Sequence, residues 1–307
     1  MGKRERLRPG RKEKKPGLKI LKSFSRIRAW LKWLDPFTYS DIFLEKIGLR
    51  ENKFFAWPFE LLVAFLTAWL IYFVLGLLLG TRSPAVVVLS GSMEPTFYRG
   101  DIMVLQGLSF ESIKGKEVIL PDAIYGKKIH EYATTYCSIN DLPELVECRY
   151  FTQKQDESTR PKYYPELGKL CIPEINKCFF IGSSKLSIQT KKICFKSTAE
   201  CIEITREGDI VVYTSDMLSI PIIHRAVVKI KAADGNFVIT KGDSVNNNFV
   251  DQEGGIASSA IPVANLDGKV IFMIPKLGYV KLIIMDDIPC VIINLIKYGN
   301  FSRCPLP

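Results

Sequence analysis

The chain has 307 residues, of which 47% are hydrophobic, and a formal net charge of +10. This length allows one large or two small domains, and the hydrophobic content excludes an intrinsically disordered chain. The hydrophobic content and the net charge also argue against an ordinary soluble protein, because the positive charge and the apolar residues are each concentrated in particular segments.

Residues 1–57 are predicted to form a basic cytoplasmic tail. Residues 1–28 hold twelve Lys or Arg against two Glu. Residues 18–34 place apolar side chains on one helical face and basic ones on the other, as in an amphipathic helix that lies on a membrane or packs against protein. Contact with membrane lipid is favoured and no nucleic acid is expected, because no base-stacking aromatic residues are interleaved with the basic ones.

Residues 58–80 are predicted to be a transmembrane helix. Residues 61–79 are nineteen positions without a charge, about 28 Å of helix at 1.5 Å per residue, close to the thickness of a hydrocarbon core. Pro58 is expected at the helix start, where proline is tolerated. The basic tail predicts a single-pass protein of the cell membrane, or of the endoplasmic reticulum membrane in a eukaryote. Its N-terminus would be cytoplasmic, and everything after Arg82 would lie outside.

All eight cysteines follow this apolar run. Six of them fall between residues 137 and 201, inside a cysteine-rich insertion at 107–204, which indicates an oxidising compartment and disulfide bonds. Six cysteines permit 15 pairings, of which we favour pairing between nearest neighbours. No C-x-x-C motif is present, so we expect neither a metal ion nor another cofactor. The eight are Cys137, Cys148, Cys171, Cys178, Cys194, Cys201, Cys290 and Cys304.

Short strands surround the insertion on both sides. Residues 99–106 and 207–213 are similar units, each a Gly-Asp turn followed by an apolar strand, and further β-branched runs follow between 221 and 275. We therefore expect a mainly β catalytic body made of residues 84–106 and 205–284. Residues 285–307 form a C-terminal apolar segment that is interrupted too often for a confident second span.

Ser92 stands at the end of the β-branched run that begins at residue 86. A serine hydroxyl is a poor nucleophile until a base removes its proton. The chain has two histidines. His130 lies in the insertion and is interpreted as a surface residue, whereas His224 lies on a strand of the β body and can face the strand carrying Ser92.

The strings "SGSMEPTFYRGD", "GDIVVY", "PIIHRAVVKI" and "ITKGD" resemble type I signal peptidases of the archaeal and endoplasmic-reticulum kind. The resemblance covers about residues 60–106 and 205–280. It implies the signal-peptidase β fold and a membrane-anchored serine endopeptidase. Such an enzyme removes N-terminal signal peptides from secreted preproteins after small residues at −1 and −3. The implied partners are these preproteins, membrane lipid and the protein-translocation machinery.

The resemblance also implies roles for single residues. Ser92 would be the nucleophile and His224, where bacterial relatives have lysine, the general base. The oxyanion hole would be formed by the Ser90 hydroxyl and the Ser92 backbone amide.

The acidic residue that would orient His224 departs from the family pattern, in which two aspartates stand six residues apart. Asp243 matches the first, but the sixth residue on is Phe249 and the next acid is Asp251, eight residues on. A two-residue insertion in the loop explains the offset. Asp251 is assigned the role of orienting His224, and Asp243 a supporting role.

Two other classes of protein remain open. One is a catalytically inactive, membrane-anchored binding protein that presents the disulfide-rich insertion to a partner, which the displaced acid allows. The other is a Ser-Lys protease, which requires a lysine where His224 stands, and the neighbouring Arg225 cannot replace it because a guanidinium stays charged.

Overall fold

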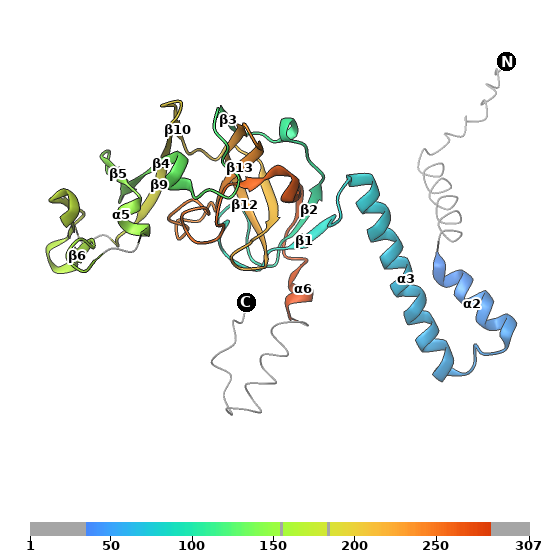
Figure 1. Ribbon diagram of the computed structural model, residues 1–307. Coiled ribbons are helices and arrows are strands. Elements are labelled where there is room, and N and C mark those ends of the chain that lie inside the picture. Colours follow the sequence, from blue (N-terminus) through green and yellow to red (C-terminus); the bar gives the residue numbers. More distant parts are fainter. Residues whose placement is uncertain (1–34, 154–155, 183–184, 284–307) are drawn as a thin grey trace, which may run out of the picture. The chain divides into compact units, whose positions relative to one another are not determined.

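The computed structural model of the protein describes residues 35–153, 156–182 and 185–283 (Figure 1). The chain divides into two compact units, Met1–Val74 and Leu75–Pro307. The amphipathic helix predicted at 18–34 and the apolar segment predicted at 285–307 lie outside the described residues, so both stay predictions.

Two helices precede the β body, α2 (Pro36–Ile47) and α3 (Lys53–Leu79). Helix α3 has 27 residues and an apolar stretch with a mean hydropathy of 2.5, so its length and composition suffice to cross a membrane. The prediction that this helix starts at Pro58 is wrong, because the helix begins at Lys53. The Asn52 side chain accepts a hydrogen bond from the Phe54 N–H and caps the helix earlier. Pro58 therefore lies inside the helix, where it removes one intrahelical hydrogen bond.

The second unit is mainly β, as predicted, and its largest sheet has eight strands. Seven follow the order β1-β2-β15-β11-β12-β13-β14, and β3 pairs in parallel with β12. Strands β12 and β13, drawn in yellow to orange in Figure 1, lie side by side in antiparallel pairing. The strands of this sheet are β1 (Ala85–Val87), β2 (Ile102–Gln106), β3 (Lys116–Ile119), β11 (Ile210–Thr214), β12 (Pro221–Ala232), β13 (Gly235–Lys241), β14 (Ile261–Pro262) and β15 (Leu266–Ile274).

Two smaller sheets lie within residues 133–203, with strand orders β10-β9-β4-β5 and β6-β7-β8. Their strands are β4 (Ala133–Ile139), β5 (Leu145–Glu147), β6 (Lys162–Tyr164), β7 (Lys169–Ile172), β8 (Lys177–Phe180), β9 (Ile188–Phe195) and β10 (Cys201–Glu203). The remaining α-helices of the described residues are single turns, α4 (Ile129–Tyr132), α5 (Arg149–Thr152) and α6 (Tyr279–Leu282). The short 3₁₀ helices in the described part of the chain are η2 (Phe110–Ser112), η3 (Pro165–Leu167), η4 (Pro173–Ile175) and η5 (Val263–Asn265).

The segment 107–204 is joined to the β body by pairing and by a shared core. Its strand β3 belongs to the large sheet. Ile193 and Phe195 of β9 are buried in the same hydrophobic cluster as Val228 and Ile230 of β12. The apolar faces of β9 and β12 therefore remove each other from water, and the segment is packed against the strand that carries His224.

The predicted nearest-neighbour disulfide pairing is confirmed. The bonds are Cys137–Cys148, Cys171–Cys178 and Cys194–Cys201. In the last two pairs the cysteines stand directly opposite each other in the hairpins β7–β8 and β9–β10. The register of each hairpin therefore selects the partner.

Candidate active site

Ser92 lies in the turn that follows β1. Its neighbour Met93 is 1% exposed and packs with Val88, Met103 and Val212 beneath the turn. The buried methionine thus fixes the backbone next to the serine. The Ser90 hydroxyl donates a hydrogen bond to Ser92 Oγ at 3.3 Å, so both serines predicted to belong to the site lie together.

The loop after β13 approaches the serine from the other side. The carbonyl oxygen of Ser92 accepts hydrogen bonds from the Ser244 N–H at 3.0 Å and from Asn247 Nδ2 at 3.4 Å. A Cβ atom at Gly242 would lie 2.5 Å from that carbonyl oxygen and 1.8 Å from Asn247 Nδ2. Position 242 therefore has to be glycine for the loop to come this close to Ser92.

His224 is the fourth residue of β12, opposite Val211 of β11, and is 2% exposed. Its Nδ1 is 2.7 Å and 2.8 Å from the two carboxylate oxygens of Asp251. An ionised carboxylate can accept but not donate, so the hydrogen lies on Nδ1. The lone pair that could take a proton from a serine is therefore on Nε2.

Asp251 is fully buried, at 0% exposed. Besides His224, its carboxylate accepts hydrogen bonds from the Tyr213 hydroxyl at 2.8 Å and from Thr240 Oγ1 at 2.6 Å. Burial and the neighbouring Asp251 carboxylate raise the pKa of Tyr213, so the phenol keeps its proton and donates. The aspartate is thus surrounded by donors that carry no permanent charge.

Asn247 links the histidine to the serine. Its Nδ2 lies 3.3 Å from His224 Nε2 as well as 3.4 Å from the Ser92 carbonyl oxygen. The asparagine is itself held in the loop, because its backbone oxygen accepts a hydrogen bond from Lys241 Nζ at 2.6 Å. Ser92, Asn247, His224 and Asp251 therefore form one connected set of contacts.

Asp243 has different partners. It accepts hydrogen bonds from Arg225 Nε at 2.8 Å and Arg225 Nη2 at 2.5 Å, and from Thr96 Oγ1 at 2.6 Å. Burial opposes its charge, but these bonds and the charges of Arg225 and Arg206 together hold the pKa of Asp243 below its usual range. The structure therefore brings Asp251 to the histidine and Asp243 to the arginine that follows it.

Three residues of this arrangement escaped the sequence analysis: Asn247, Tyr213 and Thr240. The run of three asparagines at 246–248 and the tyrosine that ends "GDIVVY" are signals that could have drawn attention to two of them. His130 is exposed, as its interpretation as a surface residue predicts.

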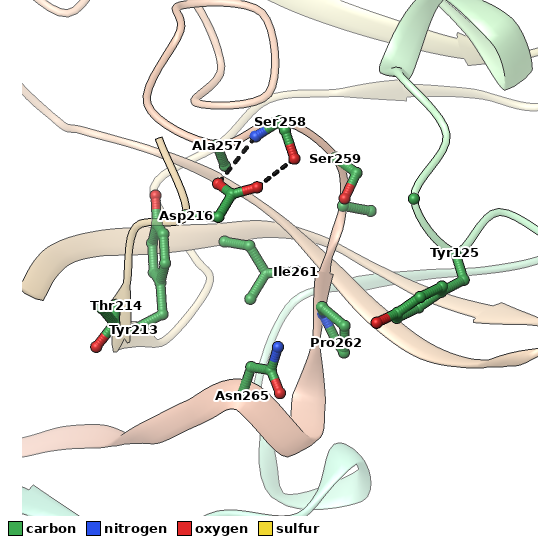
Figure 2. Close-up of a pocket in the computed structure, with 12 residues that line it drawn as sticks. Tyr125, Tyr213, Thr214, Asp216, Ala257, Ser258, Ser259, Ile261, Pro262 and Asn265 are labelled. Atoms are coloured by element: carbon green, nitrogen blue, oxygen red, sulfur yellow. Dashed lines mark hydrogen bonds between the residues drawn. The ribbon is translucent and has the colours of Figure 1, made fainter. Parts of the chain in front are cut away.

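A pocket lies next to this arrangement, and Figure 2 shows its lining. Asp216 points toward Ser258 and accepts hydrogen bonds from its backbone N–H and its hydroxyl. Tyr213 lines the pocket and also contacts Asp251, so the pocket adjoins the acid rather than Ser92. Among the described residues, no group of three or more His, Cys, Asp or Glu side chains could hold a metal ion.

Serine hydrolases use a serine, a histidine and a buried aspartate for acyl transfer. In this chain the aspartate contacts His224 directly, and Asn247 joins His224 to the backbone of Ser92. Several curated proteins are similar to the chain. The signal peptidase complex catalytic subunit SEC11C of Homo sapiens is 39% identical over 82 residues, 26% of this chain and 42% of the relative. SEC11 of Scheffersomyces stipitis is 25% identical over 243 residues, 78% of this chain and 85% of the relative.

A third relative, sec11 of Sclerotinia sclerotiorum, is 33% identical over 107 residues, 34% of this chain and 60% of the relative. The chain spans between 42% and 44% of the length of the mammalian relatives that it matches. No family model matches the chain. The chain is similar to catalytic subunits of the signal peptidase complex, as its motifs predict.

Proposed function

We propose that the protein is a membrane-anchored serine endopeptidase that removes N-terminal signal peptides from secreted preproteins. The observation that carries this proposal is the connected set Ser92, Asn247, His224 and Asp251, in which a buried carboxylate contacts Nδ1 and leaves Nε2 directed toward the serine's loop. The relatives named as signal peptidase catalytic subunits support it.

In the proposed reaction, Ser92 Oγ attacks the scissile carbonyl carbon and His224 Nε2 takes the hydroxyl proton. The resulting oxyanion receives hydrogen bonds from the Ser92 amide and the Ser90 hydroxyl. His224 then gives its proton to the leaving amine, which breaks the peptide bond and leaves an ester on Ser92. Water hydrolyses that ester with the same histidine acting as base. Asp251 keeps the hydrogen on Nδ1 and stabilises the imidazolium.

The substrate binds in extended form. Strand β1 ends the order of the large sheet, so its outer edge can pair with a peptide through main-chain hydrogen bonds. The proposed enzyme selects substrates with small residues at −1 and −3, as the family resemblance implies. Asp243 supports the site by joining Thr96, in the turn after Ser92, to Arg225.

The proposed membrane topology is based on helix α3 and the basic tail. Helix α3 spans the membrane with the N-terminus cytoplasmic and the β body outside, where preproteins emerge from the translocation machinery. Membrane lipid contacts the tail. The relatives' names imply that further subunits of a complex bind the chain.

The test is cleavage of a model preprotein by the purified full-length chain in detergent. Ser92→Ala and His224→Ala are each expected to abolish cleavage while the protein stays folded, because both residues supply chemistry rather than core volume. The exposed Ser197→Ala and His130→Ala are matched controls that should cleave normally. Normal cleavage by either site variant contradicts the proposal, and an inactive wild type that still binds a partner supports the inactive binding protein instead.

A further inference from the structure

The cysteine-bridged segment 107–204 contacts the loop that carries Asp251. Strand β9 supplies two of these contacts. The Thr190 N–H donates to the Asn248 carbonyl oxygen at 2.8 Å, and Gln189 Nε2 donates to the Val245 carbonyl oxygen at 2.6 Å. Two backbone positions between Asp243 and Asp251 are therefore held by the segment.

Gln189 also holds the loop through a buried lysine. Its Oε1 accepts a hydrogen bond from Lys241 Nζ at 3.2 Å. The same Nζ donates to the carbonyl oxygens of Gly242 at 3.1 Å and Asn247 at 2.6 Å. One glutamine side chain thus supports three carbonyl groups of the loop, one directly and two through Lys241.

The other end of the loop is held at Glu253, two residues after Asp251. Its carboxylate accepts hydrogen bonds from Thr135 Oγ1 of β4 at 2.7 Å and from Thr152 Oγ1 of α5 at 3.2 Å. Both donors belong to the segment 107–204. Asp251 therefore lies between two points of attachment to that segment.

A disulfide lies directly beneath the β9 contact. Cys137 and Cys148 are both 0% exposed. Thr190 Oγ1 lies 3.8 Å from Cys137 Sγ and 3.7 Å from Cys148 Sγ. Phe249 of the loop packs against the buried cluster formed by Cys137, Cys148 and Ile188, so this cluster supports both sides of the contact.

We infer that the segment 107–204 serves as an internal support that positions Asp251 against His224, with Gln189 and Glu253 as its positioning residues. This inference rests on the proposed function. Fixing the loop that carries Asp251 in one conformation costs conformational entropy. The support offsets that cost, and displacements of about 1 Å in such a site lower rates by about 10²-fold.

The test compares substitutions at the two positioning residues in the full-length protein. Gln189→Ala and Glu253→Ala are each expected to lower kcat for a model preprotein about tenfold, and the double variant about a hundredfold, with KM within twofold of wild type. Glu253→Gln keeps an oxygen that accepts from the threonines and should restore most of kcat. Glu166→Ala, an exposed change in the same segment, is the matched control.

The disulfides provide a second comparison. Cys137→Ser with Cys148→Ser should lower kcat, whereas Cys171→Ser with Cys178→Ser should leave it within twofold, because that bond lies in the separate hairpin β7–β8.

Amide hydrogen exchange of residues 243–253 gives a readout that does not depend on cleavage. Exchange should be faster in the double variant Gln189→Ala, Glu253→Ala than in wild type, at an unchanged thermal midpoint. Unchanged exchange, or an unchanged kcat beside an active wild type, overturns the inference. An inactive wild type with faster exchange in the double variant overturns the proposed function and leaves the support in place.

Discussion

Strand β12 carries His224 and Arg225 side by side, and each is paired with a different aspartate. On one side, Asp251 is completely buried and receives hydrogen bonds from Tyr213 and Thr240, which carry no permanent charge. On the other, Asp243 receives two hydrogen bonds from the guanidinium of Arg225.

This difference indicates which aspartate can serve a catalytic histidine. The charge of Asp243 is already balanced by a group that stays ionised. Within the part of the chain that the structure describes, the carboxylate of Asp251 receives its hydrogen bonds from Tyr213, Thr240 and His224 and from no guanidinium, so its charge is available to an imidazolium. Successive side chains of a strand point to opposite faces, so the two residues cannot exchange aspartates without a change of register.

The largest effect is expected for Asp251→Asn. The amide can donate to Nδ1, which favours the tautomer with the hydrogen on Nε2 and removes the base. We expect kcat for a model preprotein to fall about 10⁴-fold, as for the wrong tautomer in other Ser-His-Asp enzymes, with little change in KM. Steady-state kinetics in detergent measures both. A loss below tenfold would show that Ser92 and His224 work as a dyad.

Asp243→Asn should lower kcat much less, by about tenfold, because it loosens Thr96 and Arg225 rather than the histidine. Its larger effect is on stability, since Arg225 is 8% exposed and loses its charged partner. Breaking such a buried pair costs about 3 kcal/mol, which a lowered thermal midpoint would report. If the kinetic severities of the two asparagine variants are reversed, Asp243 is the acid and our account is wrong.

Asp243→Asn should also change how the stability of the protein depends on pH. The pKa of Asp243 is lower in the folded protein than in the unfolded chain. The unfolded state therefore binds more protons as the pH falls below the ordinary aspartate range, and the stability that Asp243 contributes is lost as the pH falls through its folded pKa. In Asp243→Asn this part of the acid slope should vanish. A thermal midpoint with the same acid slope in both proteins contradicts the pairing.

A smaller effect is expected for Tyr213→Phe, which removes one of the uncharged donors to Asp251 while keeping the ring. The lost hydrogen bond is worth about 1 kcal/mol, which corresponds to about a fivefold loss of kcat. Tyr98→Phe, at an exposed tyrosine, is the matched control. A Tyr213→Phe variant with wild-type kcat and reduced stability would assign the hydroxyl a role in folding alone.

Much of this molecule could be predicted from local sequence. The apolar run at 61–79 predicts helix α3, the alternating β-branched runs predict the mainly β body, and short spacing between cysteines favours nearest-neighbour disulfides. Each of these signals lies within a few residues of chain. The helix start was misjudged because capping by Asn52 outweighs the preference of proline for the first turn.

The surroundings of the site could not be predicted in this way. Tyr213 and Thr240 reach Asp251 from the two strands that flank β12, because β11 and β13 both pair with it. The attachment of the aspartate loop to β9 joins residues about sixty positions apart. Such contacts depend on tertiary packing, which a single sequence does not contain as a local pattern.

The most direct test of the account is covalent trapping of the nucleophile with a signal-peptide analogue that carries an electrophilic phosphonate in place of the scissile carbonyl. Mass spectrometry of the full-length protein then locates the adduct. The account predicts an adduct on Ser92 that forms about tenfold more slowly than in wild type in Asp243→Asn, about 10⁴-fold more slowly in Asp251→Asn, and not at all in Ser92→Ala. An adduct on another residue, or equal rates in Asp251→Asn and wild type, would contradict it.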